Sequence, residues 1–215
     1  MKVSRKKAPF GGRLIVVGGQ CRKVGKTALV VDLLRAFPSM RWVAVKITPY
    51  AEAGCPVRGS TCKCAPNRHT FAIRVDKDRT GESDTSRFLA AGAERALWVQ
   101  TKDGRVADGL AALAAKLSKA ENVIVESDAI IKFWQPDLYL MVLDPRNDDF
   151  KTSAWAGLRV ADGFVYRSPT SRGRGKGNRT AGDGLKSFVQ HLGWRLPERL
   201  RQYVMRHLVA AKHLS

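Results

Sequence analysis

A glycine-rich segment between two apolar stretches constrains this chain more than any other feature. Residues 13–17 form a short apolar run that predicts a buried strand, and residues 27–37 have the spacing of an amphipathic helix. Between them, residues 18–27 read Gly-Gly-Gln-Cys-Arg-Lys-Val-Gly-Lys-Thr. Glycines let backbone amides point inward, and a helix N-terminus favours negative charge. The segment therefore predicts a loop that binds phosphate groups.

The residue types in this loop suggest separate roles. We expect Lys26 to reach the β- and γ-phosphates, where its charge makes it a candidate catalytic residue, and the Thr27 hydroxyl to bind Mg²⁺. Five residues rather than four separate Gly19 from Gly25, so Gln20 takes the position of the usual first glycine. Arg22 and Lys23 fit either phosphate contacts or solvent-exposed positions. The expected nucleotide contacts are Gly19, Gln20, Arg22, Lys23, Val24, Gly25, Lys26, Thr27 and Ala28.

The order of elements beyond the loop indicates an α/β fold. The sequence predicts strands at 42–47, 70–75, 96–100, 122–125, 138–143 and 163–167. It predicts helices at 84–95, 106–119, 185–192 and 197–214. Alternating strands and helices build a parallel sheet with helices on both faces. We predict a three-layer P-loop NTPase domain with a mostly parallel sheet over residues 13–167.

The segments outside this domain differ in composition and charge. Residues 1–12 predict a basic arm, residues 168–184 a flexible basic loop, and residues 185–215 a helical appendage. The net charge of +19 favours polyanion partners such as nucleic acid, although a solvated basic surface explains it equally well. The sequence contains no apolar run long enough to span a membrane and no signal-peptide pattern. We therefore expect a cytoplasmic protein.

Three cysteines and a histidine fall in or beside a long irregular segment at residues 50–68. Cys55, Cys62 and Cys64 precede His69 by short spacings, and thiolates with imidazole are ligands of Zn²⁺ and iron–sulfur clusters. Cys21 in the phosphate loop is an alternative fourth ligand. The spacing matches no common metal signature, so free thiols in a surface loop remain the alternative interpretation.

Short motifs in a fixed order suggest a resemblance to known families. The five-residue loop spacing, with Val24 before Gly25-Lys26-Thr27, resembles dethiobiotin synthetase. The later order of motifs resembles molybdopterin-guanine dinucleotide biosynthesis protein B over about residues 14–144. Those motifs are His69-Thr70-Phe71, Gly81, Asp84-Thr85-Ser86-Arg87, Ala91-Gly92-Ala93 and Val123-Ile124-Val125-Glu126. The glycine that usually follows the last motif is replaced by Ser127.

The resemblance implies a compact NTPase, often dimeric, in which Asp84 and Glu126 help Thr27 hold Mg²⁺. Glu126 is also a candidate catalytic residue, since it ends a strand at the edge where α/β sheets bind ligands. A lysine in the region of Lys46 touches substrate in the synthetase, so Lys46 is a candidate for a substrate or γ-phosphate contact. From the sequence alone, Asp84 fits a helix N-cap equally well, and Glu126 fits an ordinary strand-end carboxylate.

Three functions are consistent with these features. The first is Mg²⁺-dependent GTP or ATP binding and hydrolysis by an accessory protein of molybdenum cofactor biosynthesis. The second is ATP-dependent activation of a small molecule, as in dethiobiotin synthetase. The third is a nucleic-acid-binding NTPase, suggested by the basic ends. The sequence lacks an Asn-Lys-x-Asp guanine motif after a late strand, so the choice between ATP and GTP stays open.

Overall fold

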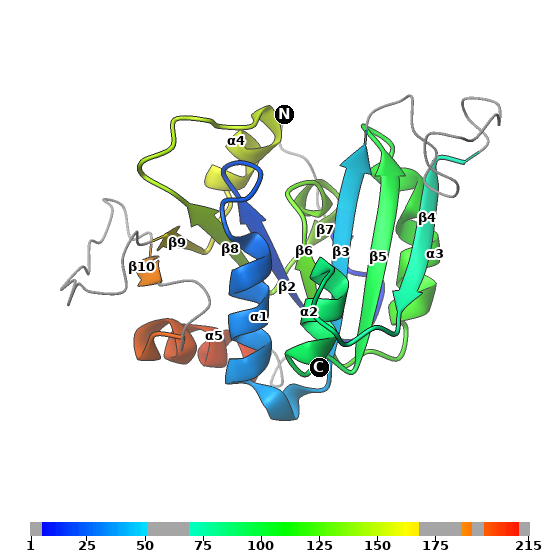
Figure 1. Cartoon of the computed structure of the whole chain (residues 1–215), viewed down its shortest axis with the longest axis horizontal. Helices are drawn as coiled ribbons and strands as arrows, with labels where there is room; N and C mark the ends of the chain where they lie inside the picture. The colour runs from blue at the N-terminus through cyan, green and yellow to red at the C-terminus, as the bar shows by residue number, and fades with distance from the viewer. Residues whose placement is uncertain (1–5, 51–68, 168–185, 191–195, 211–215) are drawn as a thin grey trace.

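The computed structural model describes residues 6–50, 69–167, 186–190 and 196–210 (Figure 1). The predicted flexible loop at 168–184 lies outside these residues, as do Cys55, Cys62 and Cys64.

A central sheet forms the middle layer of the described part of the chain. Its eight strands follow the order β10-β9-β8-β2-β6-β3-β5-β4. Neighbouring strands are parallel except β4, which runs antiparallel to β5 at one edge. The strands are β2 (Arg13–Gly19), β3 (Trp42–Tyr50), β4 (Phe71–Asp76), β5 (Arg95–Lys102), β6 (Asn122–Glu126), β8 (Leu138–Leu143), β9 (Gly163–Arg167) and β10 (Lys186–Gln190). A separate parallel pair joins β1 (Lys6–Lys7) to β7 (Trp134–Gln135).

Helices cover both faces of the sheet (Figure 1). One face carries α1 (Lys26–Ala36), α2 (Asp84–Ala90) and α5 (Glu198–Ala210), and the other carries α3 (Leu110–Leu117) and α4 (Thr152–Leu158). Short 3-10 turns are η1 (Pro38–Met40), η2 (Val106–Gly109) and η3 (Ile130–Lys132). Among the described helices, none has the length and apolar character needed to cross a bilayer.

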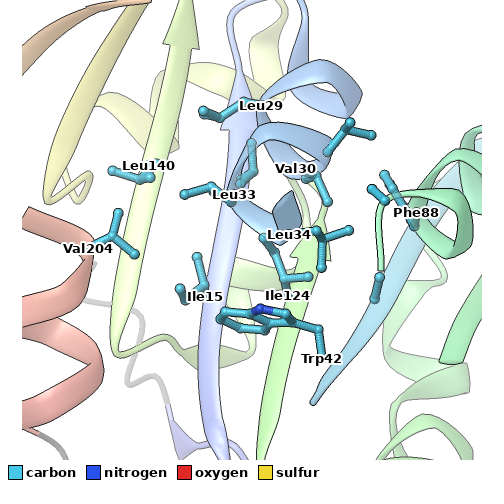
Figure 2. Packing of buried hydrophobic residues seen from close by; sticks show 14 of the residues in the cluster. Ile15, Leu29, Val30, Leu33, Leu34, Trp42, Phe88, Ile124, Leu140 and Val204 are labelled. Carbon is cyan, nitrogen blue, oxygen red and sulfur yellow. The ribbon is translucent and has the colours of Figure 1, made fainter. Parts of the chain in front are cut away.

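Alternation of side chains along the strands divides the apolar core in two. Ile15 of β2 packs toward α1 and α5, whereas its neighbour Leu14 packs toward α3 on the opposite face. Figure 2 shows the α1 side, where Leu33 and Leu34 of the helix lie over the sheet and above the indole of Trp42. Strands buried on both faces explain the continuous apolar runs of the sequence. The predicted three-layer α/β class with a mostly parallel sheet is confirmed.

Some predicted elements differ from those observed. Residues 186–190 were expected to be helical, but they form strand β10, which pairs in parallel with β9 beyond the expected last strand. Tertiary packing determines this state, because Phe188 of β10 lies against the ring of Tyr203 on α5, with centroids 5.2 Å apart. The helix predicted to reach residue 95 ends at Ala90, since Gly92 has a left-handed backbone with φ of 105°. Helix α4 was not predicted.

Candidate nucleotide-binding site

The turn between β2 and α1 has the form of a phosphate-binding loop. Gly25, the N-cap of α1, has φ of 113°, and Lys23 also has a positive φ of 58°. A Cβ on Gly19 would lie 2.6 Å from the side chain of Val24, so the loop folds back closely over its own start. The side chains of Arg22 and Lys23 are exposed, and that of Val24 is buried. The loop therefore turns tightly into the N-terminus of α1, where backbone amides favour an anion.

Lys26 reaches across the loop from the first turn of α1. Its Nζ donates to the carbonyl of Cys21 at 3.0 Å and lies 3.7 Å from Oδ2 of Asp128. Burial lowers the pKa of Lys26, the charge of Asp128 opposes that decrease, and the charge of Lys151 adds to it. The ammonium group is therefore held inside the loop mouth, where the sequence predicted contact with phosphates.

The three residues expected to hold Mg²⁺ converge beside the loop. Thr27 Oγ1 donates to Glu126 Oε2 at 2.7 Å. The ammonium of Lys46 lies 2.9 Å from Glu126 Oε1 and 2.5 Å from Asp84 Oδ2. Lys46 thus stands between the two carboxylates as their counter-charge. A hydroxyl and two carboxylates form the oxygen donor set that Mg²⁺ prefers, so the residues present fit this ion.

Burial and charge act in opposite directions on Lys46. Burial disfavours its ammonium form, but the charges of Glu126 and Asp84 and their hydrogen bonds outweigh burial and raise its pKa. Glu126 is 5% exposed, so it needs a cation nearby. The register of the sheet supplies that cation, because Lys46 of β3 is paired with Glu126 of β6.

The N-cap of α2 is Ser83 rather than Asp84. The Ser83 hydroxyl accepts from the Ser86 amide, and the Ser86 hydroxyl accepts from the Ser83 amide, which forms a reciprocal capping box. The Asp84 side chain does not cap the helix. Its Oδ2 contacts Lys46, and its Oδ1 lies 3.8 Å from the guanidinium of Arg87.

Sequence reasoning missed Asp128, which follows Glu126 by two residues. Its Oδ1 accepts from the amide of Gly19 at 2.6 Å, while Oδ2 faces both Lys26 at 3.7 Å and Lys151 at 3.6 Å. The signal available in the sequence was a second acid just past a strand that already ends in one. Lys151 offered no such signal, because it precedes a helix that was not predicted.

Gln20, expected to contact nucleotide, instead turns its side chain into the protein. It is 5% exposed, and its Nε2 donates to the carbonyls of Asn147 and, at 3.2 Å, of Asp149. Its Oε1 accepts from the amide of Asp144 at 3.0 Å. The side chain therefore fastens residues 144–149, which leave β8, to the start of the phosphate loop. The Gln20 backbone still belongs to the loop.

The cysteines are divided between described and undescribed parts of the chain. Cys21 of the loop has a buried side chain, whose sulfur accepts from Asn147 Nδ2 at 3.3 Å, and burial raises the pKa of its thiol. His69 is half-buried just before β4. Within the residues that the structure describes, no group of three or more His, Cys, Asp or Glu side chains is placed to hold a metal ion.

The chain has a structural neighbour among known proteins. No protein-family model matches the chain, and no curated protein matches it. Among solved structures, the chain is similar to the "apo" form of LpxK from Aquifex aeolicus in complex with ATP, with 19% identity and a TM-score of 0.49. The matched region covers 86% of this chain and 55% of that one. The chain therefore spans about half the length of this structural neighbour.

Proposed function

We propose that the chain binds a Mg²⁺–nucleoside triphosphate at residues 19–28 and acts on its terminal phosphate. The observation that carries this proposal is the convergence of Thr27, Asp84 and Glu126 beside the loop that ends in Lys26. They come from three separate elements, α1, α2 and β6, so the tertiary fold brings them together. The loop amides and Lys26 receive the phosphates, and the three oxygen-bearing side chains hold the metal.

The ion pairs of the site suggest that a bound metal ion takes the place of a lysine ammonium group. Lys26 and Lys151 face Asp128, while Lys46 faces Asp84 and Glu126. A metal held by Thr27, Asp84 and Glu126 would replace the ammonium of Lys46 between the carboxylates and neutralise part of the phosphate charge. Lys46 is then released toward the phosphates or a second substrate. Lys26 stabilises the charge that develops on the terminal phosphate.

The finer assignment follows the order of motifs in the sequence. That order supports an accessory NTPase of the molybdopterin-guanine dinucleotide type, which hydrolyses GTP or ATP slowly. The position of Lys46 favours a second candidate, ATP-dependent phosphoryl transfer to a small molecule as in dethiobiotin synthetase. A nucleic-acid-binding NTPase is the third, and it requires strongly salt-dependent binding to polynucleotides.

Thermal unfolding with nucleotides tests the proposal. At a ligand concentration of about 100 times Kd, binding adds about 2.7 kcal/mol, which for a chain of this size raises Tm by about 5–10 °C. We expect this rise with Mg-ATP or Mg-GTP, and the nucleotide giving the larger rise identifies the base. EDTA should remove the metal-dependent part of the shift. If millimolar Mg-ATP and Mg-GTP both leave Tm unchanged, the chain does not bind nucleotide at this loop.

Replacing Lys46 tests the proposed metal site. Lys46→Met leaves the buried Glu126 without its paired cation and removes the nearer of the two cations beside Asp84, so the free energy of unfolding in EDTA should fall by about 3 kcal/mol. Because the variant frees both carboxylates, millimolar Mg²⁺ alone should restore much of the lost Tm, whereas wild-type Tm should respond weakly to Mg²⁺ without nucleotide. Thermal scans across a Mg²⁺ titration measure both effects.

Arg87→Met is the matched control, because the exposed Arg87 lies 3.8 Å from Asp84, whereas Glu126 is paired with Lys46. Its Tm and its Mg²⁺ response should stay near those of the wild type. A Lys46→Met protein that is destabilised but indifferent to Mg²⁺ would contradict the assignment of these carboxylates to a metal.

A further inference from the structure

A second lysine faces the mouth of the loop from a distant part of the chain. Lys151 is the N-cap residue of α4, and its Nζ lies 3.6 Å from Oδ2 of Asp128. Lys26 Nζ lies 3.7 Å from the same oxygen. Exposed fractions are 12% for the Lys26 side chain, 11% for Asp128 and 32% for Lys151. Two ammonium groups therefore share one carboxylate at the rim of the loop, with the outer one open to an incoming ligand.

The phosphate loop itself fixes the position of Lys151. The amide of Lys151 donates to the carbonyl of Gln20 at 3.0 Å. The Gln20 side chain also bonds to the amide of Asp144 and to the carbonyls of Asn147 and Asp149, so the whole segment leading to Lys151 is fastened to the loop. A glycine at position 20 would have no side chain to make these bonds. The unusual glutamine in the loop is therefore explained as the anchor of the segment that carries Lys151.

Charge balance at the rim favours an anion there. Asp128 faces two ammonium groups, those of Lys26 and Lys151. Burial is the largest cause of the lowered pKa of Lys26, and the charge of Lys151 adds to that decrease, whereas the charges of Asp128 and Glu126 oppose it. Asp128 Oδ1 also accepts from the amide of Gly19, so the carboxylate occupies a position with both backbone and lysine donors. Phosphate oxygens accept the same kinds of hydrogen bond and carry more charge. Asp128 thus holds both lysines ready for a phosphate group.

We propose that Lys151 contacts the terminal phosphate of the bound nucleotide and stabilises charge during its transfer, as a catalytic cation supplied by the same chain. This inference rests on the proposed nucleotide function. Water attacks the γ-phosphorus as the bond to the β–γ bridging oxygen breaks, and that oxygen keeps the electron pair as the diphosphate leaves. The water adds its hydroxyl to phosphorus, and its other proton passes to a phosphate oxygen. Lys151 and Lys26 remain protonated throughout and act through charge.

The test measures ground-state and transition-state binding separately. Wild type, Lys151→Met and Lys151→Arg are titrated with Mg-ADP and Mg-GDP, with and without aluminium fluoride, which mimics the phosphoryl group in transfer. We expect Lys151→Met to bind Mg-diphosphate within about twofold of the wild type, but to lose about 100-fold of the affinity gained with aluminium fluoride and a similar factor in turnover. Lys151→Arg, which keeps the charge, should recover part of both. Lys119→Met, at an exposed position after α3, is the control and should match the wild type.

Each outcome distinguishes the inference from the function on which it depends. If the wild type binds nucleotide but Lys151→Met keeps the full gain with aluminium fluoride, Lys151 does not contact the terminal phosphate. Equal losses with and without aluminium fluoride would assign Lys151 a merely structural role and also overturn the inference. If aluminium fluoride does not raise the affinity of the wild type for Mg-diphosphate, the role proposed for Lys151 is overturned, while the proposed nucleotide binding still stands. A wild type that binds no nucleotide overturns both.

Discussion

Lys26→Met is expected to weaken Mg-nucleotide binding and turnover together by about 10²- to 10³-fold. The methionine keeps the apolar stem that packs close to Gly19, so the loop retains its shape. What is lost is the ammonium group that now donates to the Cys21 carbonyl and faces Asp128. Fluorescence anisotropy with a labelled nucleotide gives Kd, and phosphate release gives the turnover number.

Lys116→Met provides the comparison for this result, because Lys116 is an exposed lysine on α3, on the opposite face of the sheet from α1. It should bind nucleotide as the wild type does. Circular dichroism should show the same secondary structure in both variants. If Lys26→Met binds nucleotide as tightly as the wild type, the nucleotide does not bind at this loop, even if the fold is as described.

Trp42→Ala is expected to lower the free energy of unfolding by about 3–5 kcal/mol, because it empties a large buried volume. Trp42 is 1% exposed and packs beneath α1 beside the side chains shown in Figure 2. Its indole Nε1 also donates to the Phe37 carbonyl at 2.9 Å, so alanine leaves that buried oxygen without this partner. For a chain of this size, Tm should fall by about 6–20 °C. Urea unfolding followed by circular dichroism measures the loss.

Trp155→Ala makes the same chemical change at a surface position, where Trp155 is 57% exposed and its ring packs at a tilt against Phe150 with centroids 4.5 Å apart. Its cost should stay below about 1 kcal/mol. Comparable losses in the two variants would mean that Trp42 is not a central part of the core.

The sequence predicted those features that depend on local pattern. Residues 13–37 read as strand, loop and helix because an apolar run, glycines and helical spacing follow one another directly. The strand ends also brought Lys46 and Glu126 to one edge of the sheet, since parallel strands present their carboxyl ends together. Strand β10 was mistaken for a helix, because five residues carry too little periodicity to separate the two states without their neighbours.

The parts of the site that were missed depend on long-range contacts. Asp128 meets the Gly19 amide across 109 positions of sequence, and Gln20 meets Asn147 across 127. Neither contact follows a spacing rule, because each is created by the order in which β2, β6 and β8 lie side by side. Hydrogen-bond partners of this kind become visible only when the sheet is assembled.

The buried glutamine in the loop has a thermodynamic consequence for ligand capture. A loop that becomes ordered only when its ligand binds loses conformational entropy on binding, and this loss lowers the affinity. Here the bonds between Gln20 and the segment after β8 restrain the start of the cradle before any ligand arrives. Much of the entropy cost of ordering the loop is therefore incurred when the chain folds. The loop is preorganised for its ligand, and binding should lose less affinity to ordering.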